Sequence, residues 1–81
     1  MIDFAKITQT IDGYDCHYFG TRDVFASERQ WRAHCMAVWH PQMGVFEKLY
    51  DDDGHKLSMV CGRLVRSSSQ NFRIVEASNG N

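Results

Sequence analysis

The fold of this chain depends on one stretch, SERQWRAHCMAVWHP, which covers residues 27–41. Read with the two-residue period of a strand, its odd-numbered positions from Trp31 to Trp39 are all apolar. The even-numbered positions mix arginine, histidine, methionine and valine, a composition that suits a face in partial contact with water. This alternation is regular, and it predicts a strand that ends at Pro41.

A helix at about residues 28–40 is the alternative for the same stretch. Ser27 would cap that helix, with Gln30 three residues later. Four apolar side chains would then form a stripe along it: Trp31, Cys35, Val38 and Trp39. The choice decides the fold class, because a helix here would make the protein α+β rather than all-β.

Alternating runs joined by turn sequences flank this stretch on both sides. Asp12-Gly13 lies between the strand-like runs 6–11 and 14–19, and Asp-Gly is a frequent hairpin turn because glycine and aspartate tolerate positive φ. Further turns are expected at 41–44 and 51–54, and a polar loop at 67–71. The remaining strands are expected at residues 45–50, 55–60, 63–66 and 72–76.

Five or six short strands joined by tight turns predict an all-β fold, a small antiparallel meander curled into a partly open barrel. The 81 residues suit a single domain covering 1–81, because the chain contains neither a linker nor a repeat. We expect the tail at 78–81 to be frayed. A free edge strand would allow either a monomer or a homodimer.

The composition excludes several classes of protein. Charged residues make up 23% and the net charge is −1, so the chain is neither a polycation nor a strongly acidic protein. It has no apolar run of about 18 residues, which predicts no membrane span, and no signal-peptide pattern, which favours a cytoplasmic location. The three cysteines are an odd number without close spacing, and they are expected to be free, buried thiols: Cys16, Cys35 and Cys61.

The residues that could carry chemistry do not form a recognised catalytic or metal-binding pattern. The neighbouring pairs Cys16-His17 and His34-Cys35 would point to opposite faces of a strand, which disfavours a shared zinc site. The acidic run at 51–53 lacks the spacing and the later glutamate of a calcium loop, so it is expected to be a solvated turn. No acidic partner can be placed beside a cysteine and a histidine. We therefore expect no catalytic residues, no metal and no cofactor.

The charges are divided along the chain. Residues 1–53 carry nine acidic and five basic side chains, whereas residues 54–75 carry four basic and no acidic ones. The simplest interpretation is that the two halves pair within the folded sheet. Alternatively, the basic residues Lys56, Arg63, Arg66 and Arg73 form an edge that binds nucleic acid or nucleotides, with exposed aromatics such as Tyr18, Tyr50 or Phe72 stacking on bases.

The order of the turn residues resembles a loose group of short phage and prophage proteins that begin with a Thr-x-Asp-Gly hairpin and continue as a β-meander. The matching segments are Asp3-Phe4, Gln9-Thr10-Ile11-Asp12-Gly13, Thr21-Arg22-Asp23, residues 50–54 and Asn71-Phe72-Arg73-Ile74-Val75. The chain departs from that pattern in residues 24–30 and in its two tryptophans. The resemblance implies a phage-type accessory protein and supplies no catalytic residues.

Together these observations predict a non-enzymatic protein that acts by binding a macromolecule of the host or the phage, for example as an inhibitor of a host enzyme or of a bacterial defence system. Large aromatics and arginines contribute most to protein interfaces. The candidate binding residues are therefore Trp31, Trp39, Tyr18, Tyr50, Arg63, Arg66 and Arg73. Core packing is the alternative role for both tryptophans. Nucleic-acid or nucleotide binding through the basic segment 56–73 is the alternative function.

Overall fold

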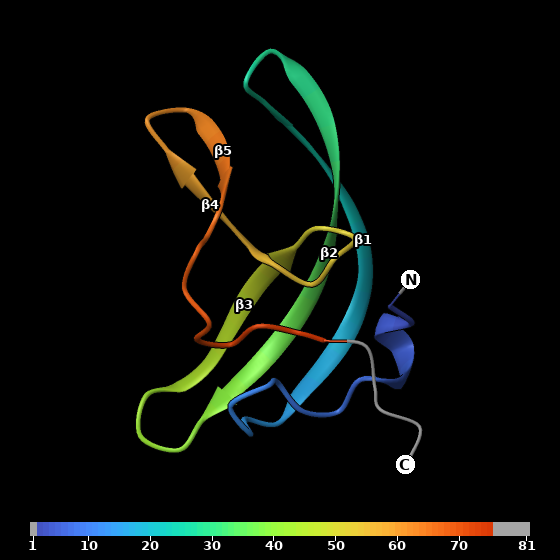
Figure 1. Cartoon of the computed structure of the whole chain (residues 1–81), viewed down its shortest axis with the longest axis vertical. Coiled ribbons are helices and arrows are strands. Elements are labelled where there is room, and N and C mark those ends of the chain that lie inside the picture. Colours follow the sequence, from blue (N-terminus) through green and yellow to red (C-terminus); the bar gives the residue numbers. More distant parts are fainter. Residues whose placement is uncertain (1, 76–81) are drawn as a thin grey trace.

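The protein is a five-stranded antiparallel sheet with the strand order β1-β2-β3-β4-β5 (Figure 1). This computed structural model describes residues 2–75, so the predicted tail at 78–81 lies outside the described residues. The elements are the short 3-10 helix η1 (Phe4–Lys6) and the strands β1 (Cys16–Ala26), β2 (Arg29–His40), β3 (Gly44–Tyr50), β4 (Lys56–Val60) and β5 (Arg63–Arg66). The predicted all-β meander, curled and partly open, is confirmed, and the helix proposed as an alternative for residues 28–40 is wrong.

Strand β2 is the longest strand and lies between β1 and β3. Its pairing places Met36 beside Tyr18 on one side and beside Lys48 on the other. Four consecutive side chains in the second half of β2 are buried, so the strand is covered on both faces there. The four are Cys35, Met36, Ala37 and Val38.

A β-bulge in β1 exchanges the two faces of that strand. The register runs from Tyr18↔Met36 to Gly20↔Cys35, so Phe19 is one residue more than β2 provides partners for. Before the bulge, even-numbered β1 residues share a face with even-numbered β2 residues. After it they share a face with odd-numbered ones, so that Val24 lies opposite Trp31. Residues 24–30 form the end of this β1–β2 hairpin.

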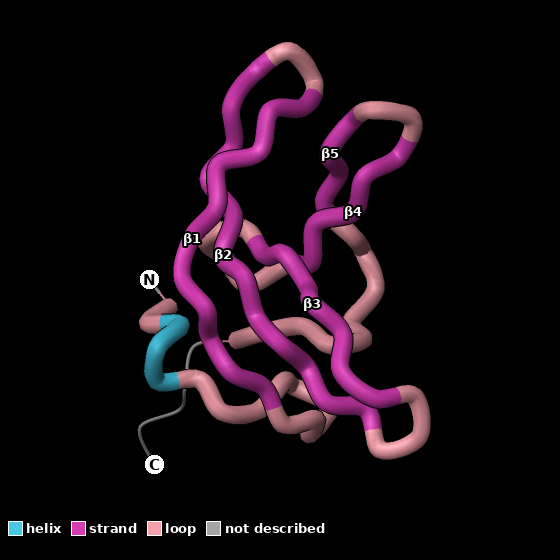
Figure 2. The backbone as a smooth tube through the Cα atoms, turned by 180° about the vertical axis from the view of Figure 1, so that it is seen from behind, coloured by secondary structure: helices cyan, strands magenta, loops and turns pink. Residues whose placement is uncertain are grey.

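The first hydrophobic cluster lies on the face of the sheet that carries Met36, which we call the covered face. The segment before β1 and the segment after β5 both cross this face, and they lie in front of β1–β3 in Figure 1 and behind them in Figure 2. The cluster contains Phe4, Ile7, Cys16, Met36, Val38, Tyr50 and Ile74. The even-numbered face of β2, predicted to be partly wet, therefore carries the main core.

The second cluster lies on the opposite face, which we call the open face, between the β1–β2 hairpin and the β4–β5 hairpin. It is smaller and contains Ala26, Ala33, Leu57 and Leu64, with Val24, Trp31 and Leu49 packed against it. The Oγ of Ser27 accepts a hydrogen bond of 3.2 Å from the backbone N–H of Leu64, which joins the two hairpins.

Two of the predicted strands are wrong. Residues 6–11 contribute only the end of η1 and one isolated bridge, Gln9↔Asp15, although the predicted turn at Asp12-Gly13 is present. Residues 72–75 form no strand either, and Glu76 lies outside the described residues. This segment instead pairs with two different parts of the chain. The N–H of Ile11 donates to the carbonyl of Arg73, and the N–H of Ile74 donates to that of Gly54.

Gly54 makes this crossing possible. It closes the predicted turn at 51–54 with a φ of +84°, and a Cβ placed on it would lie 1.9 Å from the carbonyl oxygen of Ile74. Only glycine allows the backbones to approach so closely in this conformation. The turn therefore serves both to reverse the chain and to seat the C-terminal segment.

Within residues 2–75, no helix has the length and apolar composition needed to cross a membrane.

Candidate binding site at the end of strand β2

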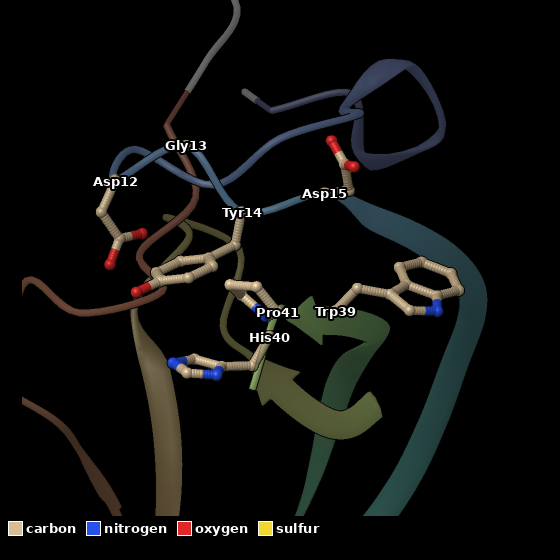
Figure 3. Close-up of a pocket in the computed structure, with 7 residues that line it drawn as sticks. All are labelled: Asp12, Gly13, Tyr14, Asp15, Trp39, His40 and Pro41. Atoms are coloured by element: carbon tan, nitrogen blue, oxygen red, sulfur yellow. The ribbon is translucent and has the colours of Figure 1, made fainter. Parts of the chain in front are cut away.

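A pocket of about 520 Å³ lies where β2 ends, beside the turn that precedes β1 (Figure 3). Its lining residues come from two short segments that are distant in sequence: Asp12, Gly13, Tyr14, Asp15, Trp39, His40 and Pro41. The pocket thus combines aromatic rings with two carboxylates, and neither lysine nor arginine is among the described residues that line it.

The two segments are held together through the backbone. The N–H of Trp39 donates a hydrogen bond of 2.9 Å to the carbonyl oxygen of Asp15. Figure 3 shows the Asp15 carboxylate and the Trp39 indole on one side of the pocket, with Tyr14 and His40 on the other. Trp39 is 44% exposed, because it follows the buried part of β2 and points to the open face.

The rings of Tyr14 and His40 form the opposite side of the pocket. They are stacked, with centroids 5.2 Å apart and an angle of 22° between their planes. The Nδ1 of His40 accepts hydrogen bonds from the backbone N–H groups of Gln42 and Met43. Because Nδ1 is an acceptor in both, the proton of the neutral ring is on Nε2, and the turn after β2 fixes the orientation of the ring.

Asp12 joins the pocket to the C-terminal segment. Its carboxylate accepts hydrogen bonds from the hydroxyl of Thr10, at 2.6 Å, and from the backbone N–H of Phe72, at 3.1 Å. Burial alone would raise the pKa of Asp12, but these hydrogen bonds outweigh it and lower the pKa below its usual value. Asp12 is therefore a structural anion, and it holds Phe72 at a positive φ of 62°.

The open face continues from the pocket along β1–β3. Val45 pairs with Trp39 and is exposed, and the exposed ring of Phe19 contacts that of His17 edge-on at 5.2 Å. The terminal segments do not cross this face of β1–β3 (Figure 2). Here the chain leaves large apolar side chains in contact with solvent.

An ion pair crosses the same face over β2. Arg22 on β1 and Glu47 on β3 approach to 3.1 Å on either side of the small side chain of Cys35. Both side chains are about half exposed, so the pair adds polar contacts to the open face and little stability.

Of the predicted aromatic binding residues, only Trp39 projects substantially into solvent. Trp31 packs against the second cluster, its indole N–H donates to the carbonyl of Ala26 at 2.9 Å, and the guanidinium of Arg29 lies 3.6 Å above its ring. Tyr18 is half-buried, with its hydroxyl 3.2 Å from Nδ1 of His34.

Tyr50, which the sequence suggested as a binding residue, is not exposed. Its side chain is fully buried in the first cluster, and its hydroxyl donates to the backbone carbonyl of Phe72. Burial raises the pKa of Tyr50 well above its usual value. Segments from both ends of the chain cover it, because Phe4 and Ile74 belong to the same cluster and the ring of Phe4 lies 6.5 Å from that of Tyr50.

The predicted basic edge is not assembled as one surface. Arg66 contacts Asp51 at 2.7 Å and Asp53 at 3.7 Å, as expected if the two halves of the chain pair with each other. Arg63 is exposed at the β4–β5 hairpin, and Arg73 binds the side chain of Gln70. Lys56 lies over the ring of Phe72, 5.3 Å from its centroid.

The acidic turn does bring possible metal ligands together. Ligand atoms of Asp51, Asp53 and His55 lie within 4.8 Å of one another. However, Asp51 also accepts hydrogen bonds from the backbone N–H groups of Asp53 and His55, which is the arrangement of a side-chain-stabilised turn. Arg66 already supplies a cation to both carboxylates, so the cluster is explained as a turn and an ion pair.

No protein-family model, no curated protein and no solved structure matches this chain. The site must therefore be interpreted from its own residues. Sequence reasoning identified Trp39 but missed the rest of the pocket: Asp12, Gly13, Tyr14, Asp15, His40 and Pro41. The available signal was that all of them lie in or beside the two predicted turns, at 12–13 and 41–44.

Proposed function

We propose that this protein is a non-enzymatic accessory protein that binds another protein through the surface around Trp39. The partner would be a host or phage protein, in line with the resemblance of the turn sequence to phage proteins. A small sheet that occludes the site of a host enzyme or of a bacterial defence system needs no chemistry of its own.

One observation carries this proposal. The sheet has two faces, and the chain covers the first with its own terminal segments while leaving Trp39, Val45 and Phe19 exposed on the second. Exposed tryptophan in a surface that also contains a pocket is typical of interface residues that contribute most of the binding free energy. The ion pair of Arg22 with Glu47 supplies polar contacts beside them.

A second candidate, nucleic-acid binding, is supported by two of the residues first predicted for it, Lys56 and Phe72, together with Lys48. The ammonium groups of Lys48 and Lys56 both lie over the ring of Phe72, at 5.2 Å and 5.3 Å from its centroid. Two cations beside an aromatic ring can attract a phosphate and a base. The ring of Phe72 is already in contact with Tyr14 and with both lysines, however, so protein binding remains the stronger proposal.

Affinity capture from a bacterial lysate, with and without nuclease, tests both candidates. We expect a defined protein to be retained by the wild type after nuclease treatment and to be lost from Trp39→Ala. A capture that depends on nucleic acid, and that Lys48→Met with Lys56→Met abolishes, would replace protein binding by the second candidate.

Phe25→Ala is the matched control, because Phe25 is an exposed aromatic at the β1–β2 hairpin, away from the pocket. It should retain the partner. Equal loss of the partner in Phe25→Ala and Trp39→Ala would show that general stickiness, rather than the surface around Trp39, was responsible for capture.

A further inference from the structure

We propose that the pocket at the end of β2 accepts an arginine side chain of the partner protein, with the guanidinium over the indole of Trp39 and paired with the carboxylate of Asp15. This inference rests on the proposed function and names the chemistry of the contact. It follows from what the chain itself does at its two tryptophans.

The two tryptophans differ in whether the chain supplies them with a cation. The guanidinium of Arg29 lies 3.6 Å above the ring of Trp31. Within residues 2–75, neither a lysine nor an arginine lies over the ring of Trp39, which is nevertheless the more exposed of the two. Tryptophan attracts cations more strongly than the other aromatic side chains do.

The charge of the pocket favours the same ligand. Asp12 and Asp15 both line it, and among the described residues neither forms an ion pair with a basic side chain. Asp12 is held by internal hydrogen bonds, whereas Asp15 is exposed and binds only the side-chain amide of Gln9, at 3.2 Å. Asp15 is therefore the carboxylate with acceptor capacity left for a partner.

Arginine fits these two groups better than lysine does. Its planar guanidinium can stack on an indole and donate in-plane hydrogen bonds to a carboxylate at the same time, whereas an ammonium group is a point charge. Figure 3 shows Asp15 and Trp39 on the same side of the pocket, with the Asp15 carboxylate pointing away from the indole, so the dual contact requires this exposed side chain to turn toward the ring.

The inference can be tested with peptides and the full chain, by following the indole N–H signal of Trp39 in an NMR titration. The peptide Ac-Gly-Arg-Gly-NH2 should shift this signal in a saturable way, and its citrulline counterpart, which has the same shape without the charge, should not. The binding is expected to be weak, because both contacts are exposed to water.

Asp15→Asn is the informative variant, since an asparagine can still accept the hydrogen bond from Gln9. It should weaken binding of the arginine peptide by up to about fivefold, the size of one exposed ion pair. Asp23→Asn removes an exposed carboxylate elsewhere on β1 and should leave the affinity unchanged. Equal binding of the citrulline peptide, or equal effects of the two aspartate variants, would overturn the inference.

The result separates this inference from the proposed function. If Trp39→Ala loses the captured protein while Asp15→Asn retains it fully, the protein-binding surface stands and the arginine contact is wrong. If the arginine peptide binds as described but no protein is retained after nuclease treatment, the pocket chemistry stands and the proposed function is wrong.

Discussion

The two hydrophobic clusters lie on opposite faces of one sheet and are closed in different ways. The first contains the largest fully buried side chains, Tyr50, Met36, Ile74 and Val38, and segments from both ends of the chain close it. The second consists of two alanines and two leucines between two hairpins. The chain therefore concentrates its apolar burial on the covered face, and the exposed surface that we propose binds a partner lies on the other.

This difference has a physical origin in chain length. A chain of 81 residues cannot bury both faces of a five-stranded sheet, because small domains bury a smaller fraction of their surface than large ones. The covered face is closed by contacts that span most of the sequence, such as that between Asp12 and Phe72, 60 residues apart. The contacts on the open face span less of the sequence, such as that between Ser27 and Leu64, 37 residues apart.

The largest expected effect is on the free energy of unfolding, when one side chain in each cluster is shortened to alanine. Met36→Ala should lower the free energy of unfolding by about 3 kcal/mol, because it leaves a cavity in the closed cluster. Leu64→Ala should cost less than half as much, because the cluster around it is small and open at its edge and can relax. Urea unfolding followed by circular dichroism measures both. Similar losses in the two variants would contradict the comparison.

A smaller effect is expected at Asp12, which fixes the C-terminal segment over the covered face. Its pKa is lowered from 3.8 in the folded state, so its contribution to stability is complete above that value and is lost as the pH falls through the lower, folded-state pKa. Asp12→Asn should cost about 1 kcal/mol at pH 7 and should flatten the acid dependence of stability.

Urea unfolding of both proteins between pH 7 and pH 2 measures this contribution. The wild type and Asp12→Asn should converge at the acidic end, where the carboxyl of the wild type is protonated. Asp23→Asn, which alters an exposed carboxylate on β1, should run parallel to the wild type. A constant gap between wild type and Asp12→Asn across the whole range would show that the charge of Asp12 has no role.

The β1–β2 hairpin offers a stabilising change of about 1 kcal/mol. Ser27 and Glu28 occupy its turn with positive φ values of 54° and 62°, which are unfavourable for residues other than glycine, asparagine or aspartate. Glu28→Gly should raise the melting temperature by relieving this strain while keeping Ser27, which binds Leu64. Gly62→Ala is the converse control, because it removes a glycine from the β4–β5 turn at a φ of +76°. It should lower the melting temperature.

The last and smallest expected effect is on the reactivity of the cysteine thiols rather than on stability. Cys61 is exposed at the β4–β5 turn, so the prediction of a buried thiol is wrong there, whereas Cys16 and Cys35 are free and buried as predicted. Burial, reinforced by the charge of Asp15, raises the pKa of Cys16 to about 11. At pH 8 the reagent DTNB should react rapidly with one thiol per chain, and Cys61→Ser should abolish that phase. Rapid reaction of Cys16 as well would show that the closed cluster opens readily.

The successes of sequence reasoning are all local. The alternation in β2 and the turns at Asp12-Gly13, 41–44 and 51–54 depend on side-chain period and backbone preference within a few residues, and each is present. The strands predicted at 6–11 and 72–76 are absent from the described residues, because these segments make isolated hydrogen bonds to each other, to Gly54 and to the start of β1 instead of a continuous ladder. Their alternating sequences do not indicate which part of the chain their backbone groups bond to.

One residue of the candidate site, Trp39, could be predicted from the sequence. Trp39 stood out by its type, and its position at the end of the alternating stretch placed it near a turn. Asp15 and Tyr14 gave no such signal, because their role depends on the hydrogen bond that joins the start of β1 to the end of β2. Tyr50 was misjudged for the same reason, since the segments that bury it come from the two ends of the chain.

By itself, then, the sequence determined an all-β chain with its central strand and most of its turns, because those features follow from the two-residue period and from the φ preferences of glycine and aspartate. Only the tertiary structure decided which face of β2 is the core. The extra residue Phe19 exchanges the two faces of β1. The two terminal segments then pack on the face that carries Met36. That choice left Trp39 in contact with solvent, and with it the surface that we propose binds a partner.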